Sequence, residues 1–85
     1  MAFPYKDVIQ NIDKEALKMK SSGDYYFLQR EDVAEALKWY QNSLSIVTIN
    51  NTVLRRELAE VIPICLATLH RYDEAFLAFQ VGYKT

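Results

Sequence analysis

The sequence predicts an all-α protein in which four helices form two antiparallel helix–turn–helix hairpins, stacked as a single domain over residues 1–85. Three observations support this fold class. Apolar residues recur at spacings of three and four along most of the chain, as in helices with one buried side. Only two Gly and two Pro occur, so few positions interrupt a helix. A small residue followed one turn later by an aromatic residue occurs twice, as Ala36 with Tyr40 and as Ala75 with Phe79, which indicates two copies of one structural unit.

The first helix is expected to begin near Pro4, because the first turn of a helix does not need the N–H that proline lacks. It is expected to end near Gln29 or Arg30. One apolar stripe follows its length and predicts the side that packs in the core. The stripe consists of Val8, Ile12, Ala16, Met19, Gly23 and Tyr26.

The second helix is predicted to begin after Asp32, which can cap it, with Glu35 three residues later as in a capping box. Its expected buried residues are Val33, Ala36, Leu37, Tyr40, Leu44 and Val47. The polar segment 48–52 is predicted to end it and to form the turn between the two repeats. The pair Asn50 and Asn51 tolerates the left-handed backbone conformation that helix ends often use.

The third helix is expected to begin at Thr52 or Val53, with a kink or a restart at Pro63. Proline lacks the N–H that would bond the carbonyl of Ala59, and its ring clashes with that carbonyl. The apolar side of this helix comprises Leu54, Leu58, Val61, Ile62, Cys65, Leu66 and Leu69.

A tight link at 70–72 is predicted to lead into the fourth helix, where Asp73 in the first turn suits the helix dipole. The apolar side of the fourth helix comprises Ala75, Leu77, Ala78 and Phe79, with Gly82 and Lys84 near its end. At this end of the chain Ala78, Val81 and Tyr83 have little cover. Either the chain is a fragment of a longer repeat protein, or a homodimer or a partner covers this face, and we favour self-association or a partner.

The charge balance argues against a nucleic-acid partner, since ten Lys and Arg oppose eleven Asp and Glu and the net charge is −1. No run approaches the roughly 20 apolar residues of a membrane helix, and the first residues do not resemble a signal peptide. Cys65 lies among apolar neighbours and is predicted to be a buried thiol. We therefore expect a cytoplasmic protein with no membrane partner.

Catalysis has little support in the sequence. His70 is the single histidine and is expected to face solvent at a helix end. No pair of His or Cys residues has the spacing of metal ligands, and no Gly-rich phosphate loop occurs. We therefore expect no enzyme activity, no metal and no cofactor.

These residues resemble the tetratricopeptide repeat, a family of helix–turn–helix units of about 34 residues. The resemblance covers residues from about 17 to 84, with repeat 1 at about 4–48 and repeat 2 at about 52–84. The segment 20–27 resembles the Lys-x-x-Gly-Asn-x-x-Phe opening of the family. The remaining matches are Ala36, Tyr40 and Ser43 in repeat 1 and Ala59, Ile62, Leu66, Ala75, Phe79 and Gly82 in repeat 2.

The chain departs from the family pattern in two respects. Pro63 stands where the family prefers Gly, and the two matching alanines, Ala36 and Ala75, are 39 positions apart, which exceeds the usual period. The resemblance implies a short solenoid of two repeats. An ordinary four-helix bundle would show similar apolar stripes and remains an alternative.

In this family, partners usually lie in a concave groove formed by the first helix of each hairpin. The resemblance implies groove positions at Lys20, Asp24, Phe27, Leu28, Glu57, Glu60, Ile64 and Ala67. A subtype of the family binds acidic chaperone tails through Lys and Asn side chains. Asp24 and Val61 stand at two of those Asn positions. Since an acid repels a carboxylate and Val donates no hydrogen bond, this subtype is excluded.

The leading functional expectation is an adaptor or scaffold that binds a peptide or helix of another protein without catalysis. Two alternatives remain open. In the first alternative, the chain is a structural subunit of a larger assembly, which includes a homodimer. In the second, it is a regulatory accessory subunit of an enzyme.

Overall fold

A computed structural model describes the backbone of residues 4–84 and the side chains of residues 7–81. This part of the chain forms four α-helices and contains no β-strand. The helices are α1 (Pro4–Leu28), α2 (Val33–Ile46), α3 (Thr52–Thr68) and α4 (Tyr72–Lys84). The prediction of an all-α fold made of two helical hairpins is confirmed.

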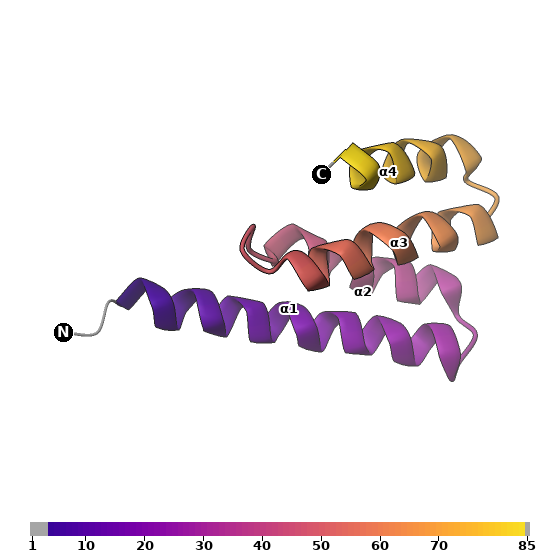
Figure 1. The fold of residues 1–85 in the computed structure, drawn as a ribbon. Coiled ribbons are helices and arrows are strands. Elements are labelled where there is room, and N and C mark those ends of the chain that lie inside the picture. Colours follow the sequence, from indigo (N-terminus) through magenta and orange to yellow (C-terminus); the bar gives the residue numbers. More distant parts are fainter. Residues whose placement is uncertain (1–3, 85) are drawn as a thin grey trace.

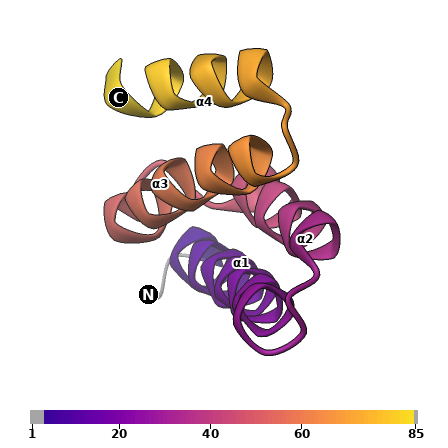
Figure 2. The same ribbon diagram turned by 90° about the vertical axis from the view of Figure 1, so that its right-hand side faces the viewer.

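The helices pack in the order of the chain (Figures 1 and 2). Helices α1 and α2 form the first hairpin, α3 and α4 form the second, and α2 packs against α3 to join them. Consequently α1 and α3 run in the same direction (Figure 1). The molecule measures 51 × 30 × 15 Å, so its thinnest dimension little exceeds one helix with side chains, about 10–12 Å.

Small residues lie where α1 meets α2. Ala16, Ala36 and Ser43 are fully buried, and the Ser43 hydroxyl donates a 2.6 Å hydrogen bond to the Ala16 carbonyl. Gly23 packs against the ring of Tyr40. Side chains this small let two helices approach closely. The core then extends through α3 to α4, and its other buried members are Leu37, Val47, Leu54, Leu58, Ile62, Cys65, Leu66 and Ala75.

Both hairpin turns use a left-handed residue, in positions that sequence reasoning did not identify. The positive φ angles belong to Glu31 (53°) and His70 (61°). The expectation of a left-handed conformation at Asn50 or Asn51 is wrong, because Asn51 instead caps α3 by accepting a hydrogen bond from the Leu54 N–H at 3.2 Å. Asn is one of the preferred residues at the position that caps the start of a helix.

The same 39-residue offset relates the two hairpins. It separates Glu31 from His70, and it separates the buried Ala36 from the buried Ala75. The second hairpin therefore repeats the turn and the small packing residue of the first.

Asp32 caps α2 as predicted, since its carboxylate accepts a hydrogen bond from the Glu35 N–H at 3.2 Å. Helix α3 continues through Pro63 as one α-helix, so the predicted restart at this residue is wrong. Packing of α3 against both α2 and α4 holds the helix together despite the missing hydrogen bond.

Several residues of the predicted apolar stripes are exposed. Val8 is 54% exposed because α1 is longer than α2 and its first turns extend past the helix that covers the rest. Leu44, Leu77 and Phe79 are exposed because α4 packs against α3 alone and leaves its flanks open. The expected roles of the Gly82 and Lys84 side chains lie outside the side chains that the structure describes.

Candidate functional site

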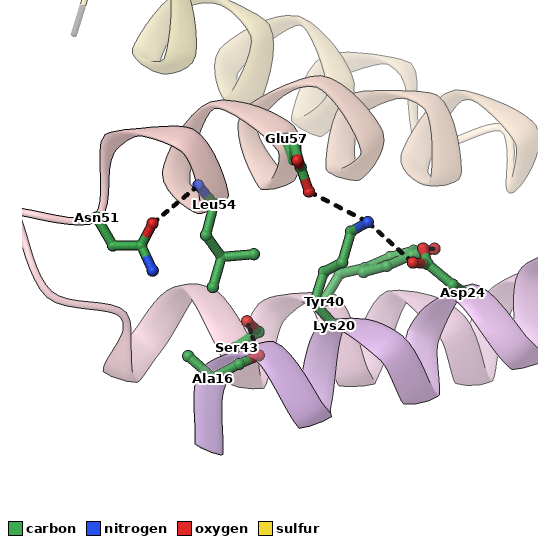
Figure 3. Close-up of polar contacts among 8 residues, drawn as sticks. All are labelled: Ala16, Lys20, Asp24, Tyr40, Ser43, Asn51, Leu54 and Glu57. Carbon is green, nitrogen blue, oxygen red and sulfur yellow. Dashed lines mark hydrogen bonds and ion pairs between the residues drawn. The ribbon is translucent and has the colours of Figure 1, made fainter. Parts of the chain in front are cut away.

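The face between α1 and α3 is the groove side expected from the sequence. At its centre the Lys20 ammonium group on α1 lies 2.9 Å from Asp24 Oδ2 and 3.2 Å from Glu57 Oε2 on α3 (Figure 3). The Tyr40 hydroxyl on α2 donates a 2.6 Å hydrogen bond to Asp24 Oδ1. This network ties three helices together.

Lys20 and Tyr40 are both held in their usual protonated states. The hydrogen bond to Asp24 raises the pKa of Lys20, burial opposes this, and Glu57 raises the pKa further. Burial raises the pKa of Tyr40, and its hydrogen bond to Asp24 raises it again. Lys20 therefore stays a cation whose charge two internal carboxylates already offset, and it is poorly placed to attract an acidic ligand.

An open hollow of about 400 Å³ lies on the N-terminal side of this network. It is defined here as the trough. Its lining residues are Gln10, Asp13, Lys14 and Leu17 of α1 and Asn51, Val53, Leu54 and Glu57 of the α3 side. Leu17 and Val53 are exposed, which gives the trough an apolar wall on each helix.

Most of the polar groups in the trough already have partners. Both carboxylate oxygens of Asp13 accept hydrogen bonds from Thr48, from its N–H at 3.0 Å and its hydroxyl at 2.9 Å. Asn51 caps α3, and Glu57 pairs with Lys20. Among the described residues, Lys14 forms no ion pair. The trough thus combines two apolar walls with one available cation.

The residues implied by the family resemblance are spread along the same face but lie mostly beyond the trough. Glu57 is the one that lines it. Phe27 and Ala67 pack partly against the core, and Lys20 and Asp24 belong to the central network. Leu28, Glu60 and Ile64 are exposed.

Sequence reasoning missed Lys14, Leu17 and Val53. The signal was present, because Leu17 precedes Lys20 by three residues and Val53 precedes Glu57 by four. Residues at these spacings share one helix face. Extending the predicted groove by one helical turn toward the start of each helix would have included them.

Two other reactive groups of the described residues are the Cys65 thiol and the His70 imidazole. Cys65 is fully buried, and burial raises the pKa of its thiol to about 11, which keeps the unreactive thiol form at neutral pH. The exposed His70 Nδ1 lies 2.8 Å from the Tyr72 hydroxyl. Within residues 7–81, no three His, Cys, Asp or Glu side chains gather as a metal site would require. None of the described helices has the length and apolar character needed to cross a membrane.

Comparisons with protein-family models, curated proteins and solved structures found no match to this chain. The geometry of the chain itself is therefore the basis for proposing a function.

Proposed function

We propose that this chain is a non-catalytic protein-interaction module of the tetratricopeptide-repeat type, whose trough binds a short segment of another protein. One observation supports this proposal most directly. Two exposed apolar side chains, Leu17 and Val53, line the same hollow as the ammonium group of Lys14. Exposed apolar residues beside a single charge are typical of a peptide-binding groove.

The trough also indicates the chemistry of the segment. One apolar side chain would pack between Leu17 and Val53, where it would be removed from water. An acidic side chain nearby would pair with Lys14. Neither Asp13 nor Glu57 forms an ion pair with Lys14, since Asp13 accepts hydrogen bonds from Thr48 and Glu57 pairs with Lys20. The proposed ligand is therefore a helical or extended segment with an apolar anchor and an adjacent Asp or Glu.

Peptides selected from a random displayed library provide the test, followed by calorimetric titration of a selected peptide. We expect Leu17→Glu and Val53→Glu to weaken binding by tenfold or more, which corresponds to about 1.4 kcal/mol. Leu77→Glu is the matched control, because Leu77 is equally exposed but lies outside the trough, on α4. Equal affinity for all four proteins would rule out the trough as the binding site.

The role of Lys14 has its own test. Lys14→Glu is expected to reject the selected acidic peptide, and a peptide with Lys in place of the acid is expected to bind this variant better than it binds the original chain. If the acidic peptide binds both proteins alike, the ionic part of the proposal fails.

The second candidate, a subunit of a larger assembly, is favoured by a different observation. Helix α4 leaves Tyr72, Phe76, Leu77, Phe79 and Val81 exposed. Large exposed apolar surfaces usually mark contacts between proteins.

A further inference from the structure

Helix α4 has apolar side chains on both flanks and packs against α3 alone. Within its described side chains, Ala75 is buried and Ala78 is half-buried against the core. Leu77 is 60% exposed on one flank and Phe76 is 62% exposed on the other. Large apolar side chains exposed on two flanks of one helix usually mark a contact with another protein, so α4 presents a surface that this chain alone does not cover.

The flank that carries Leu77 borders a continuous groove, defined here as the α2–α4 groove. Two hollows of about 370 and 510 Å³ make it up, and they share Leu44, Ile62, Leu77 and Ala78. Its floor is α3, its walls are α2 and α4, and it contains no residue of the trough. Other lining residues are Gln41, Ser45, Ala59, Pro63, Leu66 and Val81.

The two ends of the α2–α4 groove carry opposite charges. Arg55 lines the hollow that Val81 borders, and Glu74 lines the hollow that Leu66 borders. Arg55 and Leu66 are three helical turns apart on α3, about 16 Å. No ion pair of the described residues includes Arg55, whereas Glu74 pairs with Arg71, the residue directly before α4. That pair joins two exposed side chains, and a carboxylate has about four acceptor sites, so Glu74 can accept a further bond from another cation.

We propose that the α2–α4 groove binds a second copy of this chain, and that α4 lies antiparallel to α4 of the partner across a two-fold axis. A two-fold axis through the middle of the groove places each end against the opposite end of the other copy. The axis therefore produces two equivalent contacts, in each of which Arg55 of one copy faces Glu74 of the partner subunit. Leu77 of each copy then packs against the apolar groove residues of the other copy. An unrelated partner would need an acid and a base at the same separation, which a second copy supplies by symmetry.

The first test is the mass of the intact chain in solution. Sedimentation equilibrium over a wide range of concentration is expected to show a monomer–dimer equilibrium. Leu77→Glu should weaken self-association by tenfold or more and leave the helical circular dichroism and thermal unfolding of the monomer intact, because Leu77 is exposed. Ile49→Glu is the control, since Ile49 is 78% exposed and lies outside the groove. A chain that stays monomeric at every concentration, or a dimer indifferent to Leu77→Glu, would overturn the proposal.

The second test uses the symmetry of the proposed contact. Arg55→Glu and Glu74→Arg should each weaken dimerisation, because each homodimer then sets like charges against one another at both ends. A mixture of the two variants should dimerise, since a mixed pair restores opposite charges at both contacts. In a parallel arrangement Arg55 would already face Arg55 of the partner subunit, so neither single variant would weaken dimerisation, and absence of dimers in the mixture would overturn the two-fold geometry.

Discussion

The ring of Tyr40 leaves no room for a side chain at Gly23. A Cβ at this position would lie 2.6 Å from Tyr40 Cε1 and 2.7 Å from Cδ1. The ring is almost fully buried, and the bond to Asp24 anchors its hydroxyl. Glycine here serves the approach of two helices, because its backbone lies in the ordinary helical region.

Gly23→Ala is therefore expected to destabilise the protein. Alanine favours a helix over glycine by about 1 kcal/mol, whereas overpacking of a core costs about 1–3 kcal/mol. The 2.6 Å approach to Tyr40 places the cost in the upper half of that range, so we expect a net loss of about 1–2 kcal/mol in the free energy of unfolding, measured by urea denaturation. Ser21→Ala, on an exposed position of the same helix, should change stability by less than about 0.5 kcal/mol. Unchanged or increased stability of Gly23→Ala would contradict this packing.

The buried thiol of Cys65 predicts a loss of stability at alkaline pH. Burial raises its pKa from 9.0 to about 11. Above pH 9.0 the thiol ionises in the unfolded chain but stays protonated in the folded chain. Ionisation therefore stabilises the unfolded state increasingly as pH rises from 9.0 to about 11. The stabilisation is complete below pH 9.0 and is lost above it.

We expect the free energy of unfolding to fall between pH 9.0 and about 11, with Cys65 contributing at most about 1.4 kcal/mol per pH unit. Urea denaturation as a function of pH measures the slope. Cys65→Ala lowers stability at every pH through its cavity, yet should show a shallower alkaline slope. An identical slope in both proteins would exclude this thiol as the cause.

At the scale of elements, Asp32 and Asn51 cap the starts of α2 and α3 through local hydrogen bonds, and α3 tolerates an interruption. The carbonyl of Ala59 lacks the helical N–H that Pro63 cannot provide. Both residues line the α2–α4 groove. Contacts on two sides therefore maintain a helix that its own backbone hydrogen bonds would leave weakened.

Pro63→Ala is expected to stabilise α3, because it restores one backbone hydrogen bond and removes a steric clash. We expect an increase of about 1–2 kcal/mol, less than the full helix penalty of about 3 kcal/mol, because proline also restricts the unfolded chain. The free energy of unfolding should be measured with and without Pro63→Ala in a chain that also carries Leu77→Glu, so that self-association does not contribute. A decrease would mean that packing of the proline ring outweighs the missing hydrogen bond.

At the scale of the whole molecule, one polar network links the two hairpins. Lys20 is 21% exposed and joins Asp24 on its own helix to Glu57 on α3. Salt screens partly exposed pairs of this kind, and each contributes about 0–1 kcal/mol. The main contacts between helices are α1 with α2, α2 with α3 and α3 with α4, so this network adds a direct link between α1 and α3.

Lys20→Ala is expected to lower the free energy of unfolding by about 0.5–1 kcal/mol at low salt and by less at high salt. Lys18→Ala is the matched control, because Lys18 lies 4.0 Å from Glu15 on the exposed side of α1. Denaturation curves at two ionic strengths separate the two variants. Equal effects would show that the link between hairpins contributes nothing measurable.

Local sequence determined the helices. The cap at Asp32 and the spacing of apolar residues act within one or two turns, so they predicted the number of helices and most of their ends, whereas the cap at Asn51 was not predicted. The small residues Ala36 and Ala75 predicted that hairpins pack closely, and both are buried.

Tertiary structure decided which of the matching side chains are available to a partner. Lys20 and Asp24 share a helix face that sequence spacing identifies, but only the approach of α3 and α2 pairs them with Glu57 and Tyr40. The same packing leaves Leu77 exposed, because α4 packs against α3 alone. Exposure and pairing depend on distances between segments far apart in the chain, whereas helix formation depends on neighbours a few residues away.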